Sequence, residues 1–425
     1  ATIVMTEPHA GSDIGLARTR AVAKGDGTWA ISGTKIFISY GDHDLCDQIL
    51  HIVLARTPDA PPGIKGLSLF LVPKRLPDAN GTPGVANRVR AARVEDKMGI
   101  NGSPTCEMLF EEATGWLLGR EGDGIRNMFT MVNSMRLDVG AQSAGVAGAA
   151  LAKAQAYVQE RRQGGRGADG GPVPLLAHAD VRRQLMQMRA WTEGYRALLY
   201  TAALEEDLAN AGPEAERGAA RDLVEWLLPL VKAGGSDAAF RVANQAIQLH
   251  GGHGYVFEHG VEQLARDVRI AAIYEGANAI QAIDLVTRKL AQENGRRARV
   301  FAARIRSSLA AARGRRETAE IAAALEAALP PFERATQYML AHAASRDGLA
   351  GASSYLELAA VIAVGWMWLE MAAKADPAAP AEAAKPALAH FFAEDALPAC
   401  DLLARRAMSG AAAIDALGDA ALCAS

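Results

Sequence analysis

The chain has 425 residues, with 45 Lys and Arg against 48 Asp and Glu and a formal net charge of -3. A chain of this length usually exceeds one compact core, so we expect roughly two or three domains. Because the charges are spread along the chain and form no basic block, the sequence argues against a nucleic-acid-binding arm, and we expect no nucleic-acid partner.

The cysteines, the apolar runs and the start of the chain indicate in which cellular environment we expect the protein. The four cysteines form no C-x-x-C pair, which indicates neither a disulfide framework nor a zinc ribbon and is typical of a reducing compartment. The most apolar stretch, Leu358 to Leu369, has about 12 residues, whereas a spanning helix needs roughly 20, so we predict a buried helix and no membrane span. The chain starts at Ala1 without an initiator Met or a charged leader, so we expect a fragment that would have lost any N-terminal signal.

Short β-rich runs separated by Gly, Pro, Asn and Asp occupy residues 2 to 112 and predict an antiparallel β-domain. In the second of these runs, period-2 alternation places Ile36 and Ile38 on one face and Phe37 and Ser39 on the other. The predicted strands include Trp29–Ser32, Lys35–Ser39, Gln48–Leu54 and Leu67–Val72.

After the turn-rich segment 119–124 the sequence becomes helical and stays so. Small residues among the apolar positions suit a tight helical bundle, and the glycine-rich Gly164–Pro174 predicts a loop. Helices are predicted at about Ile125–Arg162, Ala179–Asn210, Glu214–Lys232, Ser236–His250 and Asn278–Asn294.

Past residue 295 the composition shifts to alanine-rich amphipathic helices, with Pro330-Pro331 and Asp376–Pro380 as expected breakers. The predicted helices are Arg297–Ala312, Glu317–Leu329, Tyr355–Ala373 and Ala387–Ala407. The complete pattern predicts an α+β fold with a β-domain over 1–115, a helical bundle over 116–293 and an additional helical domain over 294–425.

Two segments of the β-domain are candidates for binding. Met5 to Asp13 reads Met-Thr-Glu-Pro-His-Ala-Gly-Ser-Asp, a strand end and loop that can offer backbone N–H groups and hydroxyls to a polar cofactor edge. Its chemistry alone favours an ordinary Asx or Ser turn. Gly33 to Gly41 puts an aromatic ring and a hydroxyl two residues apart on one sheet face, as a flavin ring would require, and the alternative there is an ordinary half-buried hairpin.

A third segment, Gln248 to Tyr255, reads Gln-Leu-His-Gly-Gly-His-Gly-Tyr, and His259 follows closely. His250 and His253 are not the i, i+4 pair of a helical zinc site, and the glycines between them break the helix, so we predict no metal site. Glycines at a helix end more often permit the close approach of another backbone or of a ligand.

The fourth segment is Ile-Tyr-Glu-Gly-Ala-Asn, residues 273 to 278. Asn278 is a plausible N-cap for the following helix, which places Glu275 in the loop just before it. The helix N-terminus favours the ionised carboxylate, while a dry pocket raises its pKa, so Glu275 could be a base tuned towards working pH. The alternative is a solvated capping carboxylate.

The four segments, in this order and at this spacing, resemble the acyl-CoA dehydrogenases. The matching strings are M-T-E-P-x-A-G-S-D, G-x-K-x-x-I-x-x-G, Q-x-x-G-G-x-G-Y and I-Y-E-G-x-x-x-I-Q, which are highly specific together. The resemblance covers about residues 2 to 290, and the helical tail resembles the C-terminal extension of some members.

The resemblance implies a role for each matching residue. Glu275 is implied to be the catalytic base, and Arg161 and Gln163 are implied to reach the FAD pyrophosphate of a neighbouring subunit. The other residues implied to contact FAD are Met5, Thr6, Phe37, Ser39, Gln248, Gly252 and Ala277. Those implied on the substrate side are Ser12, Asn133, Arg136, Tyr274 and Gly276.

The resemblance also implies a reaction. Hydrogen bonds from the flavin ribityl chain and the backbone N–H of Glu275 polarise the thioester carbonyl, and Glu275 takes the α-proton as the β-hydrogen passes to the flavin, giving trans-2-enoyl-CoA. Electrons then pass to an electron-transfer flavoprotein. The implied assembly is a homodimer or homotetramer.

Four further strings look like a bacterial branch of the family that includes 3-(methylthio)propanoyl-CoA dehydrogenases, which suggests a short acyl chain and a cytoplasmic bacterial protein. They are Gly102–Cys106, Gly115–Gly119, His250–Tyr255 and Gln281–Leu285.

Two departures from the family pattern leave alternatives open. Ala277 stands where the family commonly has a cofactor-contacting threonine. The resemblance also leads us to expect that this fragment lacks the N-terminal helical domain that forms one wall of the family's active site. We expect weaker FAD binding from the first and poor activity from the second. An acyl-CoA oxidase of the same fold and a non-catalytic helical interaction protein are the other two hypotheses.

Overall fold

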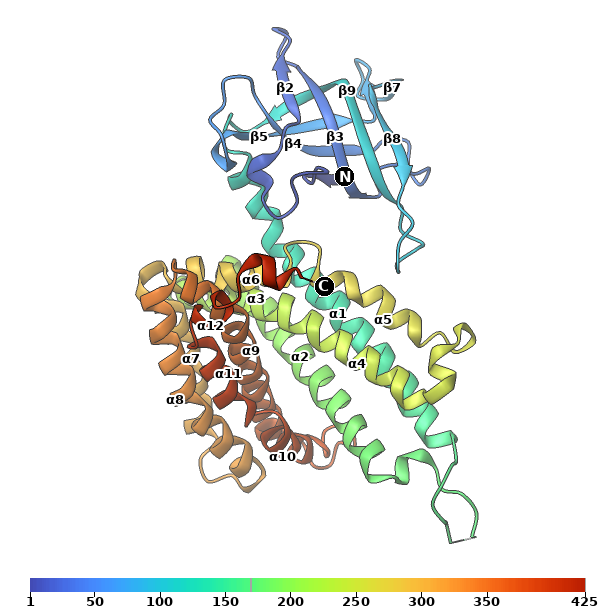
Figure 1. Ribbon diagram of the computed structural model, residues 1–425, viewed down its shortest axis with the longest axis vertical. Coiled ribbons are helices and arrows are strands. Elements are labelled where there is room, and N and C mark those ends of the chain that lie inside the picture. Colours follow the sequence, from blue (N-terminus) through green and yellow to red (C-terminus); the bar gives the residue numbers. More distant parts are fainter. Residues whose placement is uncertain (169, 425) are drawn as a thin grey trace. The chain divides into compact units, whose positions relative to one another are not determined.

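The computed structural model describes residues 1–168 and 170–424, and for residues 129, 130, 132 and 133 it describes the backbone alone. Contacts divide the chain into two compact units, Ala1–Ser134 and Met135–Ser425 (Figure 1). The first is built on strands and the second on helices, and the division falls within one long helix. The predicted α+β fold class is confirmed.

The β unit is a curved sheet whose strands close on themselves. Its strands are β1 (Thr2–Val4), β2 (Arg20–Ala23), β3 (Trp29–Ser39), β4 (Leu50–Arg56), β5 (Leu67–Pro73), β6 (Arg75–Pro77), β7 (Pro83–Ala86), β8 (Val89–Val94) and β9 (Thr105–Leu118). Strands β2, β3, β9, β5 and β4 pair in a ring, and β8 lies beside β9. Most ladders are antiparallel as predicted, but β4 pairs in parallel with β1 and with β2. The apolar strand faces turn inward around a core that includes Val4, Ile31, Val53, Phe70 and Phe110.

Strand β3 runs continuously from Trp29 to Ser39, where two separate runs were predicted, and it contains a bulge. Its register against β9 shifts between Lys35 and Ile38, and Phe37 within that step has φ 61°. An extra residue in one strand breaks strict alternation. Ile38 is buried, Ile36 is half-buried, and Phe37 is 61% exposed.

A buried ion pair ties the loop after β1 to β3. The Lys35 ammonium lies 2.9 Å from Glu7 Oε1 and donates to the Met5 carbonyl at 2.8 Å. Glu7 also accepts from the backbone N–H of Arg18 and from the N–H and hydroxyl of Thr19. Lys35 is 0% exposed and Glu7 3%, so each depends on the other for its charge.

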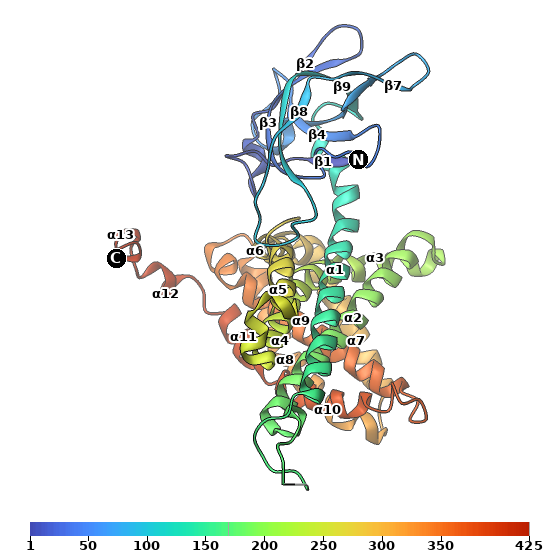
Figure 2. The same ribbon diagram turned by 90° about the vertical axis from the view of Figure 1, so that its right-hand side faces the viewer.

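The helical unit contains a bundle and an extension. The bundle consists of α1 (Gly124–Glu160), which begins in the β unit, and of α2 (Ala179–Ala211), α3 (Glu214–Pro229), η4 (Leu230–Gly234), α4 (Gly235–His250), η5 (Gly251–Tyr255), η6 (Phe257–His259), α5 (Glu262–Val268), η7 (Arg269–Ala272), α6 (Asn278–Asp284), η8 (Leu285–Leu290) and η9 (Gln292–Gly295). The extension consists of α7 (Arg296–Ala311), η10 (Arg316–Thr318), α8 (Ala319–His342), α9 (Arg346–Lys374), α10 (Lys385–Asp395), α11 (Ala399–Ala407), α12 (Ala412–Asp415) and α13 (Asp419–Leu422). Figure 2 shows α12 and α13 leading away from the other helices of this unit. Short helices η1 (Ile14–Leu16) and η2 (Ile64–Gly66) belong to the β unit, and η3 (Leu175–Ala177) precedes α2.

Bundle and extension share one hydrophobic core. Trp226 of α3, Phe301 of α7, Phe332 of α8 and Tyr355 of α9 pack ring against ring and are at most 1% exposed. Helix α9 is long and apolar enough to cross a membrane by length and composition alone, but 78% of its apolar window is buried inside the protein. The prediction of a buried helix there is confirmed. The predicted division at residues 293 and 294 stays a prediction.

Several helix boundaries differ from the predictions. Helix α8 continues through Pro330 and Pro331, because Leu329 and Phe332 are buried on either side and their packing outweighs the lost backbone hydrogen bonds. Helix α9 begins at Arg346, where the Ser345 hydroxyl accepts from a backbone N–H in the first turn. The region predicted as Ala387–Ala407 is two helices, α10 and α11.

The helix predicted at Glu214–Lys232 does not end at residue 232. Its observed counterpart, α3, is followed directly by the π-helical turn η4 and then by α4. A π-turn inserts an extra residue into the helix and turns its side chains to another direction. A second π-helical turn, η8, follows α6 and interrupts the predicted helix Asn278–Asn294. Each π-turn carries a fully buried lysine, Lys232 in η4 and Lys289 in η8.

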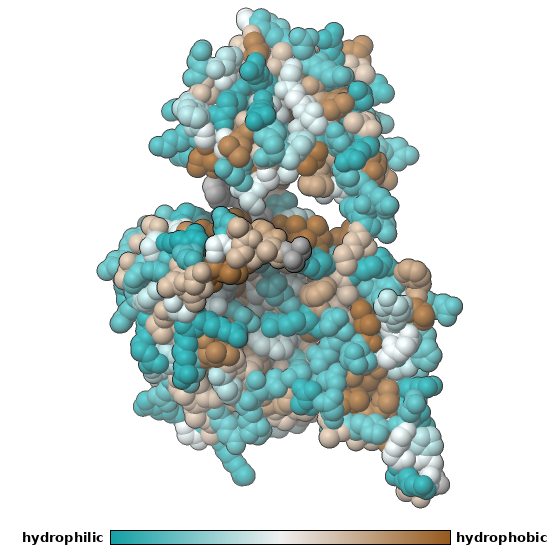
Figure 3. Space-filling view, viewed as in Figure 1, coloured by the Kyte–Doolittle hydropathy of each residue, from teal (hydrophilic) through white to brown (hydrophobic). Residues whose placement is uncertain are grey.

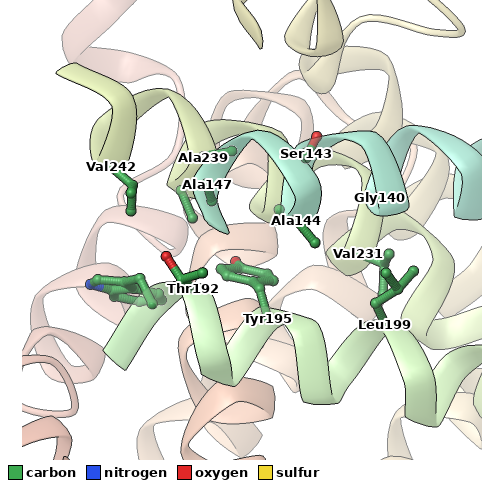
Figure 4. A pocket seen from close by; sticks show the side chains of 13 residues that line it. Gly140, Ser143, Ala144, Ala147, Thr192, Tyr195, Leu199, Val231, Ala239 and Val242 are labelled. Atoms are coloured by element: carbon green, nitrogen blue, oxygen red, sulfur yellow. The ribbon is translucent and has the colours of Figure 1, made fainter. Parts of the chain in front are cut away.

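Small residues bring α1, α2 and α4 close together around an enclosed cavity of about 10 Å³ (Figure 4). Ala144 and Ala147 of α1 face Thr192 and Tyr195 of α2 across it. A cavity of this size holds roughly one water molecule, so it cannot accept an acyl chain.

The surface is mixed in polarity, with hydrophilic side chains over most of the face in Figure 3.

We expect the ion pair between Glu7 and Lys35 to contribute to the stability of the β unit. Lys35→Met leaves the Glu7 carboxylate buried without its cation, so the β unit should lose about 3–5 kcal/mol. Urea titration of the whole chain, with hydrogen exchange of the β3 amides as the readout, measures this loss. The exposed Lys24→Met is the control and should change stability by less than about 0.5 kcal/mol. Equal losses in the two variants would contradict the structural role of the pair.

Candidate active site

Glu275 lies in the loop between η7 and α6, in an unusual backbone conformation. Its φ is 52° and that of Gly276 is 85°, so two consecutive residues are left-handed. Glycine adopts such a conformation without cost, but a residue with a side chain does so only where the surroundings hold it. The Glu275 side chain is only half-buried. A strained carboxylate in a loop is a candidate functional group.

The helix after this loop starts differently from the prediction. Ala277 is the N-cap of α6 and provides no capping side chain, while Asn278 is the first helical residue. The Asn278 amide instead donates to the Ala233 carbonyl at 3.2 Å, to Ser236 Oγ at 3.0 Å and to Asp237 Oδ1 at 2.8 Å. The predicted cap at Asn278 is therefore wrong, because a partner in η4 and α4 competes with the local backbone.

Lys232 is a buried group next to the Glu275 loop that sequence reasoning missed. It is 0% exposed, and its ammonium donates to the Gly276 carbonyl at 2.6 Å and to Asn278 Oδ1 at 3.1 Å. Burial lowers the pKa of this ammonium to about 8, against the opposing pull of Asp237 and Glu275. A lysine at a predicted helix end gives no sign of such contacts, since the π-turn that aims it is not visible in the sequence.

Electrostatics around Glu275 favour a base. Partial burial raises the pKa of its carboxyl above the ordinary glutamate value, and the positive charge of Lys232 opposes that rise. Tyr274 lies beside it, where its hydroxyl donates to Gln142 Oε1, and burial together with the Glu275 charge raises the Tyr274 pKa. A carboxylate that is partly desolvated and yet kept ionised is a stronger base than one in water.

The substrate-side predictions on α1 have different outcomes. Arg136 is 5% exposed and pairs with Asp284 of α6 at 3.1 Å, and Asp284 also binds Arg288. This pairing gives Arg136 a structural partner that sequence reasoning did not foresee, and its predicted substrate contact stays a prediction. The side chain of Asn133 lies outside the described residues.

Glycines shape the turn that follows α4. Gly251 has φ 58° and ends the helix, and a Cβ on Gly254 would overlap the Ile247 carbonyl. Gln248 and Gly252 are exposed, and a Cβ on Gly252 would meet no atom within 4 Å. Both therefore lie on an open surface, where a ligand could reach them.

The histidines of this turn gather around Tyr157 of α1. Its ring stacks on His250 at 4.3 Å between centroids, and its hydroxyl lies 2.7 Å from His253 Nδ1. His250 also contacts the Ala246 carbonyl through Nδ1 at 2.7 Å. These contacts are aromatic and hydrogen-bonding contacts that fix the turn against α1.

The cofactor residues predicted at the end of α1 lie next to each other. Arg161 and Gln163 are exposed, and the guanidinium of Arg161 donates to Gln163 Oε1 at 3.1 Å. The Gln163 backbone N–H donates to the Val173 carbonyl at 3.0 Å, which anchors the base of the glycine-rich loop. An exposed guanidinium suits a phosphate.

In the β unit, the first two segments meet through the backbone. The Ile36 N–H donates to the Thr6 carbonyl at 2.9 Å, and the Lys35 ammonium holds the Met5 carbonyl. Phe37 and Ser39 are exposed at the bulge of β3, and Ser12 is exposed in the loop. The structure thus brings the two segments together and leaves the predicted ring-contacting side chains accessible.

Three regions of the chain match known protein families. Residues 2–113 match the acyl-CoA dehydrogenase middle domain, residues 122–290 the acyl-CoA dehydrogenase C-terminal domain, and residues 301–417 the acetyl-CoA dehydrogenase C-terminal-like domain. The chain therefore belongs to the acyl-CoA dehydrogenases, which are FAD-dependent oxidoreductases, and to those members that carry a C-terminal extension.

Individual relatives agree. The chain is 43% identical over 411 residues to the 3-methylmercaptopropionyl-CoA dehydrogenase of Ruegeria pomeroyi, a match that covers 94% of this chain and 70% of that protein. It is 36% identical over 430 residues to the broad-specificity linear acyl-CoA dehydrogenase of Mycobacterium tuberculosis, covering 93% and 70% of the two. The fold matches that of an acyl-CoA dehydrogenase complexed with FAD from Bacillus anthracis, with a TM-score of 0.74, 23% identity, and coverage of 96% of this chain and 68% of that one.

The residues present fit FAD, as the cofactor of this family. Exposed Phe37 and Ser39 offer a ring face and a hydroxyl, and the exposed Arg161 guanidinium suits a pyrophosphate. Gly252 leaves open space where a Cβ would stand. Ala277 departs from the expected pattern, because it provides neither a helix cap nor the hydroxyl implied at this position.

The raised pKa of the Glu275 carboxyl predicts how this side chain changes the stability of the fold with pH. A carboxyl whose pKa is raised on folding stabilises the fold fully below its unfolded pKa, and this contribution is lost as pH rises through the folded pKa. At pH 7 the charged carboxylate is therefore a cost, and Glu275→Gln should raise the unfolding temperature, on the order of 1–3 °C.

Thermal unfolding of the two proteins at pH 7 and again below pH 4 measures this effect. The gain should vanish in acid, where both side chains are neutral, and the exposed Glu258→Gln is the matched control. A lower unfolding temperature for Glu275→Gln at pH 7 would show that the carboxylate stabilises the loop.

Proposed function

We propose that this protein oxidises the Cα–Cβ bond of an acyl-CoA thioester to trans-2-enoyl-CoA, with Glu275 as the base. The observation that carries the proposal is the Glu275 loop, in which a partly desolvated carboxylate has a strained backbone and a buried ammonium binds the carbonyl of the next residue, Gly276. The family match supports the reaction class, and the charge arrangement supports the choice of residue.

Glu275 would act in two ways. Its carboxylate would take the α-proton, and its backbone N–H would donate to the thioester carbonyl and so acidify the α-carbon. FAD, when bound, accepts the hydrogen that leaves the β-carbon. Tyr274 and Gly276 flank the base and would contact the acyl-CoA, with Ser12, Arg136 and Asn133 as further proposed contacts.

Nine residues would hold the cofactor. Arg161 and Gln163 would meet the pyrophosphate across a subunit boundary, which is why we propose a homodimer or homotetramer. The others are Met5, Thr6, Phe37, Ser39, Gln248, Gly252 and Ala277. Six of the nine, Phe37, Ser39, Arg161, Gln163, Gln248 and Gly252, are exposed, which supports their assignment, and Met5, Thr6 and Ala277 are half-buried.

A short acyl chain is the proposed substrate, with 3-(methylthio)propanoyl-CoA among the candidates. Support comes from the Ruegeria pomeroyi relative, whose name states that substrate class. The Mycobacterium tuberculosis relative is named for broad specificity on linear chains, so longer chains are the competing outcome. An anaerobic screen of saturated acyl-CoAs from four to sixteen carbons, with the methylthio analogue, separates the two.

An electron-transfer flavoprotein is the proposed electron acceptor, and the bacterial cytoplasm is the proposed location. The oxidase alternative predicts stoichiometric peroxide from acyl-CoA and oxygen with no added acceptor. The non-catalytic alternative predicts a protein that purifies without flavin. Peroxide measurement and the visible spectrum of the purified protein distinguish all three.

The base assignment predicts a large kinetic effect. Glu275→Gln should slow the anaerobic bleaching of the flavin band by an acyl-CoA substrate about 10²- to 10⁴-fold, because removal of a general base has that typical cost. In the wild type the bleaching rate should rise with pH through a pKa above the ordinary glutamate value, since only the ionised carboxylate accepts a proton. Glu258→Gln is the control, and bleaching of Glu275→Gln at the wild-type rate would show that another group is the base.

Ala277 predicts a gain of function. Ala277→Thr would supply both a helix N-cap and a hydroxyl towards FAD, and each typically contributes about 0.5–2 kcal/mol. We expect FAD to bind about two- to tenfold more tightly and the flavin-free protein to unfold at a higher temperature. Ala279→Thr, at an exposed position in the first turn of α6, is the control. Unchanged FAD affinity with a higher unfolding temperature would assign position 277 to capping alone.

A further inference from the structure

Three lysines in the described part of the chain are completely buried, and Lys232 differs from the other two. Lys35 pairs with Glu7, and Lys289 pairs with Glu225. Among the residues that the structure describes, no carboxylate lies within ion-pair distance of the Lys232 ammonium. Burying an ammonium without a counter-ion is costly. That cost requires an explanation other than a salt bridge.

The partners of Lys232 are two neutral oxygens, and both belong to the segment that carries Glu275. The ammonium donates to the Gly276 carbonyl at 2.6 Å and to Asn278 Oδ1 at 3.1 Å. This carbonyl is part of the peptide bond between Gly276 and Ala277, one residue after Glu275. A hydrogen bond to this carbonyl fixes the plane of that peptide bond. It therefore restricts the backbone rotation of Gly276, the residue next to Glu275.

Asn278 ties the same ammonium to the start of α4. Its side-chain amide bridges Lys232 to Ser236 and Asp237, while Gln281 Nε2 lies 3.4 Å from the carbonyls of Glu275 and Gly276. The Glu275 loop is therefore held from two helices at once. This is the kind of surrounding that a left-handed, non-glycine residue needs in order to persist.

Three further charged or titratable groups act on Glu275 or Lys232. They are Asp237 from α4, Arg136 from α1 and Tyr274 from the loop. Arg136 is matched by Asp284, and the Asp237 carboxylate accepts from Asn278. Among the described residues, Lys232 is therefore the positively charged group without an ion-pair partner that acts on the pKa of Glu275.

We infer that Lys232 is a positioning residue for the base: through the Gly276 carbonyl and Asn278 it holds the Glu275 loop in its strained conformation, and its positive charge favours the ionised form of the carboxylate. The inference rests on the proposed function, because Glu275 is the base only in that reaction. Lys232 does not touch the substrate in this account and acts through the loop.

Three variants of the FAD-loaded protein test it. Lys232→Met removes the ammonium, Asn278→Ala removes the second anchor and keeps the ammonium, and Lys289→Met removes the other fully buried lysine of a π-turn. Lys289 pairs with Glu225 rather than with the loop, so its variant reports the general cost of losing a buried lysine.

Hydrogen exchange of the peptide covering residues 270–281 is the first readout, and it needs no activity. Exchange should rise about tenfold or more in Lys232→Met and in Asn278→Ala, and it should stay within about twofold of the wild type in Lys289→Met. An equal rise in both lysine variants, or no rise in Lys232→Met, overturns the inference. If Lys232→Met does not fold, Asn278→Ala carries the same test.

The kinetics of acyl-CoA oxidation are the second readout. Lys232→Met should lower kcat about ten- to a hundredfold with KM within about threefold, and the acid limb of its pH profile should move to higher pH, because removing a nearby positive charge raises the pKa of a carboxyl. Asn278→Ala should lower kcat less and leave the acid limb in place. An acid limb that does not move in Lys232→Met overturns the electrostatic half of the inference. Failure of the wild type to oxidise any acyl-CoA would reject the proposed function instead, and the exchange readout would still decide whether Lys232 holds the loop.

Discussion

A carboxylate can act as a base only if it is partly removed from water and still ionised, and those two conditions oppose each other. Burial of Glu275 raises its pKa, and the ammonium of Lys232 limits the rise. The same ammonium fixes the Gly276 carbonyl and thus the backbone of the loop. One buried lysine therefore serves both the charge and the conformation of the site. The remainder of the helical unit can be understood as the support for this contact.

That support comes from the core. Lys232 lies in a π-turn between α3 and α4, where an extra residue redirects a side chain towards α6. The flanking residues Leu230 and Val231 are at most 2% exposed and belong to the same core as α9. Because α9 comes from the extension, the bundle and the extension fold around one set of apolar side chains. The extension thus stabilises the helices that carry Lys232, although it contributes no proposed catalytic residue.

Much of this could be predicted from the sequence. The change from β-rich to helical composition near residue 119, the loop position of Glu275 and the exposed glycine turn after residue 250 all follow from local patterns of Gly, Pro and apolar residues. Local patterns are informative where short-range backbone preferences decide the structure.

The errors arose where distant parts of the chain compete with local preference. Asn278 has the chemistry of an N-cap, but Ser236 and Asp237 take its amide. Pro330 and Pro331 should end a helix, but burial of Leu329 and Phe332 keeps it intact. Lys232 and Lys35 look like ordinary surface lysines, since only the folded chain brings the Gly276 carbonyl or the Glu7 carboxylate to them. Partners far apart in sequence leave no local signal.

The central claim is that Glu275 moves the substrate α-proton, and exchange of that proton with solvent tests it most directly. The FAD-loaded protein would be incubated anaerobically in D₂O with a saturated acyl-CoA, and deuterium at the α-carbon would be measured by mass spectrometry. The account predicts incorporation by the wild type and at least about a hundredfold less by Glu275→Gln. Equal incorporation by the two proteins would contradict it.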